Sequence, residues 1–180
     1  MKKHTIILIG IVGCLISCQP QSGPTRRVTT IDTVFTTAYS EFYGAHYQLL
    51  HRNVLSLDLY SQGLTFDSLG KINGQGTNLY LSDIFIPLED STLRSCTYTV
   101  DTTGQNFTTL PGMNIDGGVT GAYLLLVNTD NTDPVSKIYY FTSGTFTIQH
   151  EGDTTDIDFH LVTEDKQTFD ATYRGVIQTK

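Results

Sequence analysis

Short runs in which apolar and polar residues alternate one by one recur along most of this 180-residue chain. The clearest is NVLSLDLYS, in which Leu55, Leu57 and Leu59 point to one side of an extended backbone. Ser56 and Asp58 point to the other side. Because successive side chains of a strand face opposite ways, a period of two predicts a strand that is buried on one face only. A chain built from such runs folds into sheets.

Further runs follow at regular spacing, with Gly, Asn and Asp clustered between them and no long helical period. They cover residues 77–87, 96–100, 121–127, 138–141, 145–149, 155–162 and 168–177. The first of them breaks its phase near Asp83, and residues 34–43 fit either a strand or a short helix. The pattern predicts an all-β domain, an antiparallel β-barrel or β-sandwich of about nine strands.

The N-terminus carries a different pattern. Lys2 and Lys3 precede an almost wholly apolar run over 6–16, which ends two residues before Cys18. A short positive region, an apolar region and a small residue before the cut are typical of a secretory signal, and the run is shorter than the roughly 20 residues that span a bilayer. The sequence LISC resembles the lipobox of bacterial lipoproteins, whose cysteine receives a diacylglycerol. IVGC, which ends at Cys14, is a weaker match.

We therefore expect a lipoprotein signal peptide over 1–17, a lipidated Cys18 with a flexible tether over 18–33, and a single all-β domain over 34–180. More than one acyl chain anchors a protein stably, so the first expected partner is a membrane on which the chain sits without crossing it. Cys18 would carry lipid and Cys14 would leave with the signal. Cys96 is then the only thiol, and no internal disulfide is expected.

The acidic balance of the mature chain argues against nucleic acid as a partner. Of the 11 Lys and Arg, Lys2 and Lys3 leave with the signal, whereas all 18 Asp and Glu remain, which gives a formal charge of −9. Basic patches bind the phosphates of nucleic acids, and an acidic surface repels them. Such a surface suits a body that is held at an anionic membrane by its lipid.

Two stretches of the chain nearly repeat each other. SCTYTV over 95–100 and SGTFTI over 143–148 share a pattern, and each leads into a turn and a further strand. The likeness fits either a structural repeat of two hairpins or convergence among Thr-rich strands. Gly144 suits a strand entrance where the backbone bends, and Gly152 suits a hairpin turn that needs a positive φ.

Several stretches together resemble uncharacterised outer-membrane lipoproteins of Bacteroidetes: the lipobox, FYG, NVLSLDLYS, LYLSDIFIP followed by LRSCTYTV, SGTFTIQHEGD and the terminal TYRG. These strand and turn patterns cover most of the mature chain and include no catalytic signature. The resemblance implies a compact all-β fold, calycin-like or a sandwich, in the cell envelope. The chain departs from the pattern at Cys96, where Gly is expected. Residues 19–23 lack the acidic tag of surface export, so a periplasmic and a surface-facing position both stay open.

One predicted strand offers groups suited to chemistry. Asp156, Asp158 and His160 alternate with apolar residues, so they share one outward face and could hold a metal or act as an acid and base pair. Nearest neighbours on such a face lie about 7 Å apart, too far for a tight two-ligand grip without a second strand. The pattern favours a solvated polar face. We assign no catalytic residue and expect no cofactor.

Tyrosines are the candidates for binding a ligand. Sugars stack best on Trp, which the chain lacks, but Tyr43, Tyr47 and Tyr60 can substitute; packing in the core or at its rim explains them as well. We expect a lipid-anchored envelope protein with a non-catalytic binding or structural domain, whose partner is a small ligand, a glycan or an envelope protein. The alternative is an envelope hydrolase that acts on glycans with Asp156 and Asp158.

Overall fold

The computed structural model describes residues 31–47, 50–67 and 69–180, which are all-β and contain no α-helix. The expected signal peptide, the lipidated Cys18 and most of the expected tether lie outside the described residues. Over those ranges no helix is long and apolar enough to cross a membrane. The strands are β1 (Val34–Gly44), β2 (Asn53–Ser61), β3 (Leu64–Phe66), β4 (Ile72–Ile86), β5 (Thr97–Val100), β6 (Thr108–Thr109), β7 (Met113–Ile115), β8 (Gly118–Thr120), β9 (Ala122–Asn128), β10 (Val135–Glu151), β11 (Thr154–Thr163), β12 (Thr168–Gly175) and β13 (Ile177–Thr179).

The main sheet closes on itself and forms a barrel. Eight strands make the ring in the order β11, β12, β1, β2, β4, β6, β5 and β10, and β10 pairs with β11 to complete it. The long strands β4 and β10 carry different neighbours along their length, so β9 bridges them at one end and the short β5 and β6 bridge them at the other. Of the two predicted architectures, the chain adopts the barrel.

The prediction of about nine antiparallel strands fits only roughly. The described residues form 13 strands, because short segments such as β3, β6 and β13 add to the long ones. Most pairings are antiparallel, but β1 runs parallel to β12 and β13, and β5 runs parallel to β6. These parallel pairings join distant or looped segments, which local alternation does not encode. The region 34–43, left open between strand and helix, is strand β1.

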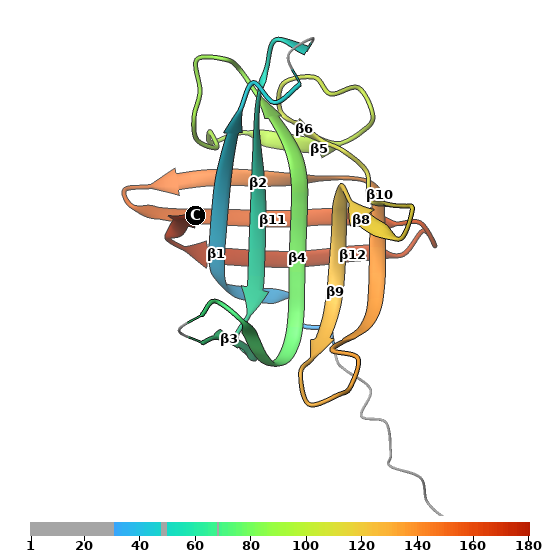
Figure 1. The fold of residues 1–180 in the computed structure, drawn as a ribbon. Coiled ribbons are helices and arrows are strands. Elements are labelled where there is room, and N and C mark those ends of the chain that lie inside the picture. The colour runs from blue at the N-terminus through green and yellow to red at the C-terminus, as the bar shows by residue number, and fades with distance from the viewer. Residues whose placement is uncertain (1–30, 48–49, 68) are drawn as a thin grey trace, which may run out of the picture.

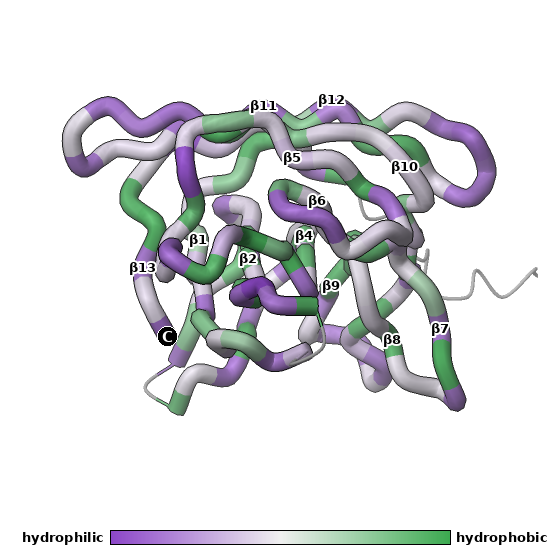
Figure 2. The backbone as a smooth tube through the Cα atoms, turned by 90° about the horizontal axis from the view of Figure 1, so that it is seen from above, coloured by the Kyte–Doolittle hydropathy of each residue, from purple (hydrophilic) through white to green (hydrophobic). Residues whose placement is uncertain are grey.

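The barrel is flattened into two layers. Figure 1 shows β1, β2, β4 and β9 upright in front, with β11, β12 and the second half of β10 running across behind them. Seen from above in Figure 2, β11, β12 and part of β10 lie along one side and β1, β2, β4 and β9 along the other, and the hairpin of β7 and β8 projects at one corner. Apolar side chains from both layers fill the space between them, as in orthogonal sheet packings.

Strand β10 belongs to both layers (Figure 1). Its first part pairs with β9 and its second part with β11, and Gly144 lies close to the change of partner. The pairing with β11 shifts register between Phe141 and Ser143, and Gly144 follows with a φ of +116°. The bend expected at Gly144 is present, although it lies inside a continuous strand instead of at its entrance.

A stack of aromatic rings fills the centre of the core. Tyr98 and Phe146 lie face to face with ring centroids 4.8 Å apart, and Phe146 stacks in turn on Phe159 at 5.8 Å. Tyr98 and Phe146 belong to the two similar stretches, which pair with each other as β5 and β10. The two stretches are therefore neighbours in the barrel and not two equivalent hairpins: β10 continues into a hairpin with β11, whereas β5 pairs in parallel with β6.

Strand β2 is buried along its whole length, although alternation predicted that one face would be exposed. Its leucines point into the barrel as expected, but Ser56, Asp58 and Tyr60 on the outer side are also covered. Tyr60 contacts the rings of Tyr39 and Phe66 edge to face, with centroids 6.2 Å and 4.7 Å away. Large side chains of the neighbouring strands thus form a second, outer layer over β2.

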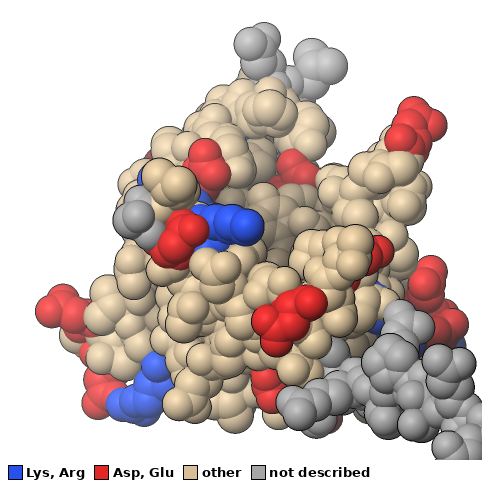
Figure 3. Space-filling model, turned by 60° about the horizontal axis from the view of Figure 1, so that its bottom comes forward, with Lys and Arg blue, Asp and Glu red and all other residues tan. Residues whose placement is uncertain are grey.

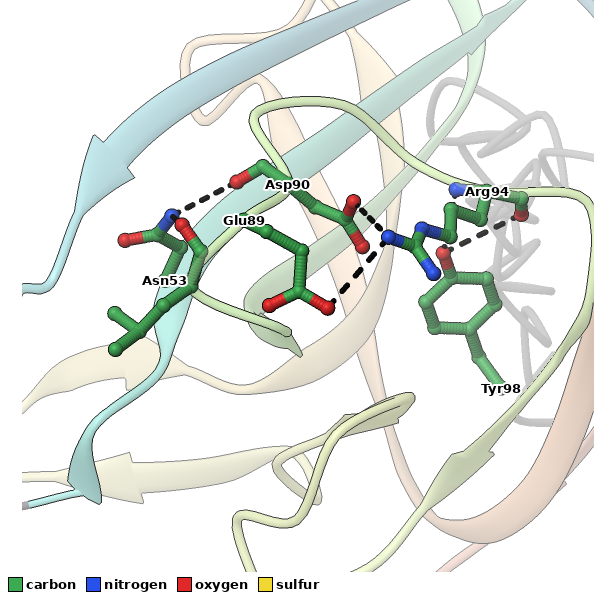
Figure 4. Close-up of polar contacts among 6 residues, drawn as sticks. Asn53, Glu89, Asp90, Arg94 and Tyr98 are labelled. Atoms are coloured by element: carbon green, nitrogen blue, oxygen red, sulfur yellow. Dashed lines mark hydrogen bonds and ion pairs between the residues drawn. The ribbon is translucent and has the colours of Figure 1, made fainter.

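Polar contacts tie down the long connection between β4 and β5 (Figure 4). The amide of Asn53 donates a hydrogen bond of 2.8 Å to the backbone oxygen of Asp90. The guanidinium of Arg94 contacts the carboxylates of Asp90 and Glu89, and the backbone N–H of Arg94 donates to the hydroxyl of Tyr98 at 2.9 Å. This connection is therefore attached both to β2, through Asn53, and to the aromatic core, through Tyr98.

Candidate functional site

A hollow of about 250 Å³ lies on the outer face of the barrel, where β1, β2 and β4 meet the hairpin of β7 and β8. Its lining comes from the end of β1, the loop that follows, β2, β4 and β8: Tyr43, His46, Val54, Tyr80, Ser82, Asp83, Val119 and Thr120. The mixture of rings, two valines and a few polar groups is the usual composition of a site for a small ligand.

A β-bulge in β4 shapes one side of the hollow. Ser82 and Asp83 together oppose the single residue Ser56 of β2, because the pairing shifts register between Leu55 and Leu57. Asp83 has a φ of +53°, in the left-handed region that residues other than Gly rarely occupy. Such a conformation costs about 1–3 kcal/mol and persists only where the surroundings hold it. The break of phase predicted near Asp83 is confirmed.

The carboxylate of Asp83 is held on both oxygens. The hydroxyl of Tyr47 donates to Oδ1 at 2.8 Å, and the hydroxyl of Ser82 donates to Oδ2 at 2.9 Å. Burial and the bond to Asp83 raise the pKa of Tyr47 to about 12, so its hydroxyl stays a donor at neutral pH. The contacts fix the carboxylate at the edge of the hollow.

The opposite wall is fixed by the base of the hairpin. Gly121 has a φ of +78°, and a Cβ built there would lie 2.0 Å from the backbone oxygen of Pro111. The N–H of Gly121 donates to the hydroxyl oxygen of Ser82 at 2.8 Å. Val119 and Thr120 directly precede Gly121 in the chain, so their positions at the hollow depend on its bond to the bulge in β4.

Aromatic rings gather at the end of β1. The ring of His46 meets the ring of Tyr47 edge to face with centroids 4.9 Å apart, and Tyr43 lies 6.3 Å from His46. The hydroxyl of Tyr43 donates to the carboxylate of Glu41 at 2.9 Å. Burial, and then the bond to Glu41, raise the pKa of Tyr43 to about 12 against the lowering effect of Ser56. Tyr43 and Tyr47 are 42% and 37% exposed, so both can contact a ligand.

Of the three tyrosines predicted to bind a ligand, Tyr43 lines the hollow, Tyr47 contacts the lining residues His46 and Asp83, and Tyr60 lies apart from it. It is only 4% exposed beneath Phe66 and Tyr39, and its hydroxyl donates to Asp58. Burial and this bond raise the pKa of Tyr60. The structure therefore places Tyr43 and Tyr47 near each other at the hollow. Tyr60 instead packs in the outer layer over β2, which is the packing role expected as the alternative to ligand binding.

The predicted metal residues share the outer face of β11, but they do not converge. The carboxylate of Asp156 is bonded to Arg174 of β12 at 3.1 Å, and His160 is paired with Asp170 at 2.7 Å. Within the described ranges, no three His, Cys, Asp or Glu side chains are close enough to hold a metal ion. Asp156 and Asp158 do line a depression of about 560 Å³ together with Arg174. The guanidinium engages the first carboxylate, as expected for a solvated polar face.

Sequence reasoning missed most of the hollow. Tyr80, Ser82 and Val119 occupy ordinary strand positions, and nothing in their local sequence distinguishes them from other outward-facing residues. One signal was available: the break of phase near Asp83 marks a bulge, and bulges are common beside functional sites.

Comparisons with protein-family models, with curated proteins and with solved structures gave no match to this chain. The resemblance to lipoproteins of Bacteroidetes stays a prediction.

Proposed function

We propose that this protein is a lipid-anchored component of the cell envelope, held to the outer membrane through an acylated Cys18, whose barrel binds a small ligand without catalysing a reaction. The observation that supports the proposal best is the hollow, where Tyr43 of β1 lines one space together with Tyr80 and Asp83 of β4. A strained aspartate that is held by two hydroxyl groups is the kind of arrangement that is retained at functional sites.

The filled interior also favours a ligand on the outer face. The barrel axis is occupied by the stacked rings of Tyr98, Phe146 and Phe159. The space between Leu124, Phe141 and their neighbours measures about 40 Å³, which is enough for about one water molecule.

Surface charge limits the kind of partner. Acidic side chains are spread over the face shown in Figure 3, in keeping with the excess of Asp and Glu in the sequence. A polyanion such as nucleic acid would be repelled. The alternative, a glycan hydrolase using Asp156 and Asp158, needs two carboxyl groups free to face one glycosidic bond, and Arg174 engages the first of them.

Co-purification tests the proposal. We expect the full chain, purified from a bacterial envelope in mild detergent, to release a small molecule on denaturation that mass spectrometry detects. A double variant, Tyr43→Ala with Asp83→Asn, should release at least tenfold less, because it loses a ring and a charge of the hollow. Loss of the bound molecule should also lower the melting temperature of the wild type toward that of the variant.

Asp158→Asn is the matched control, since it removes an exposed carboxylate on β11, outside the hollow. It should release as much ligand as the wild type. Equal release from the wild type and the double variant, or no released molecule together with no change in melting temperature on adding envelope extract, would contradict the proposed binding site.

A further inference from the structure

Three hydroxyl donors around the hollow are already used. The hydroxyls of Tyr47 and Ser82 both donate to Asp83, and the hydroxyl of Tyr43 donates to Glu41. A hydroxyl has one hydrogen, so none of these groups keeps a donor for a ligand. Their oxygens and the carboxylates retain lone pairs. These three hydroxyls therefore offer a ligand acceptor oxygens, beside the carboxylate of Asp83 and the aromatic rings of the lining.

The charge of the site has the same sign throughout. Asp83 lies in the lining, and Glu41 is bonded to the lining residue Tyr43. Among the described residues, none that lines the hollow is Lys or Arg. A ligand with a negative charge would meet two carboxylates without a counter-charge, whereas a positive one would be attracted.

Aromatic rings add to this preference. Tyr43 and Tyr80 line the hollow, and Tyr123 lies beside Tyr80 with ring centroids 5.3 Å apart. The face of a tyrosine ring attracts a cation that approaches within about 6 Å of its centre. The rings and the carboxylates thus both favour a positively charged group, and the acceptor oxygens of the lining suit one that carries N–H.

We propose that the hollow binds an organic ammonium group, carried by an amino sugar or by a small amine. The proposal rests on the proposed binding function and specifies its ligand class. At about 250 Å³ the hollow lies below the range of roughly 300–1,000 Å³ that is usual for drug-sized ligands, so it suits one sugar ring or one short amine. In the complex, the ammonium donates to Asp83 while the carbon skeleton lies against Tyr43 and Tyr80.

Two pairs of probes separate charge from shape. Glucosamine and N-acetylglucosamine share a ring and differ in the charge of the nitrogen, and putrescine and butanediol share a chain and differ in their charge. By calorimetry on the full chain, freed of co-purified ligand, we expect glucosamine to bind at least tenfold more tightly than N-acetylglucosamine. Binding of putrescine as well would assign recognition to the ammonium alone, and binding of glucosamine only would add the sugar ring to it.

Asp83→Asn locates the charge that is recognised. Asn tolerates the left-handed conformation as well as Asp does, so the bulge should remain and the melting temperature should stay close to that of the wild type. The preference for glucosamine should fall at least tenfold in Asp83→Asn and stay unchanged in Asp158→Asn. An unchanged preference in Asp83→Asn would overturn the assignment to this hollow.

Other outcomes separate this inference from the function on which it rests. Equal binding of glucosamine and N-acetylglucosamine would overturn the ammonium proposal and leave the hollow as a binding site. If neither glucosamine nor putrescine binds, the ammonium proposal is overturned as well. The co-purification experiment then decides by itself whether the hollow binds a ligand of another class.

Discussion

At the scale of single residues, Gly144 is a position where the neighbouring backbone leaves no room for a side chain. A Cβ built there would lie 2.3 Å from the backbone oxygen of His160 and 2.7 Å from the Cα of Leu161. Its φ of +116° is also unfavourable for any residue with a Cβ. We expect Gly144→Ala to lower the free energy of unfolding by about 3 kcal/mol, measured by urea denaturation.

Gly152 provides the matched control, because it lies in the turn between the same two strands. Its φ is +61°, but a Cβ there would meet nothing within 4 Å. Gly152→Ala should cost about 1 kcal/mol, from the left-handed conformation alone. Equal losses in the two variants would mean that the close approach of β10 and β11 at Gly144 does not constrain the barrel.

Residues whose backbone geometry demands a particular type were predictable from the sequence. The positive φ of Gly152 and the break of phase near Asp83 were both expected and are both present, the second as a β-bulge. The tyrosines that line the hollow were predicted only in part, because Tyr43 was among the candidates and Tyr80 was not. Alternation assigns Tyr60 to the outer face, but it does not show that Phe66, from another strand, covers that residue. Exposure within a face depends on neighbours that are distant in sequence.

At the scale of elements, β13 attaches the C-terminal end of the described chain to the outer layer. It pairs in parallel with β1, and the backbone N–H of Lys180 donates to the oxygen of Ser40 at 3.0 Å. The ammonium of Lys180 then donates to Asp58 at 2.8 Å, whose side chain is 8% exposed. Asn78 donates to the same carboxylate at 2.6 Å.

We expect Lys180→Met to destabilise the barrel by about 2 kcal/mol, because Asp58 keeps its charge and loses its cation. Methionine keeps much of the apolar stem, so most of the packing should remain. Lys137→Met is the control, since Lys137 is exposed and its ammonium lies 4.1 Å from the ring centre of Tyr139. Within the described part of the chain, Lys137 forms no ion pair with a carboxylate. It should change stability by less than about 1 kcal/mol. Equal effects in urea denaturation would argue against the ion pair as the reason.

The positions of the long strands could be predicted because the alternation is local. Their ends and partners could not. Strand β4 begins at Ile72, five residues before the predicted run, and the runs 138–141 and 145–149 join as one strand through Gly144. The parallel pairing of Val34 with Thr172 links the two ends of the domain. No local pattern specifies such a pairing, since its energy depends on how the whole sheet closes.

At the scale of the whole molecule, closure separates a barrel from a sandwich, and alternation does not distinguish the two. Both architectures bury one face of each strand and expose the other. Here the ring closes because β10 is long enough to pair with β9 in one layer and with β11 in the other. The bend at Gly144 makes this possible. The sequence of β10 alone does not predict the closure, because it depends on pairing with both β9 and β11.

The proposed attachment to a membrane concerns the whole molecule, and we expect it to depend on Cys18. We expect the wild type, expressed in a bacterial envelope, to partition with membranes. Its intact mass should match a chain that starts at Cys18 and carries acyl groups, because two or more acyl chains give stable anchoring. Cys18→Ala should remove both the added mass and the membrane association. Cys14→Ala should keep both. Loss of the added mass in Cys14→Ala but not in Cys18→Ala would assign the lipid to Cys14. An unmodified soluble wild type would contradict the proposal that this barrel is anchored to a membrane.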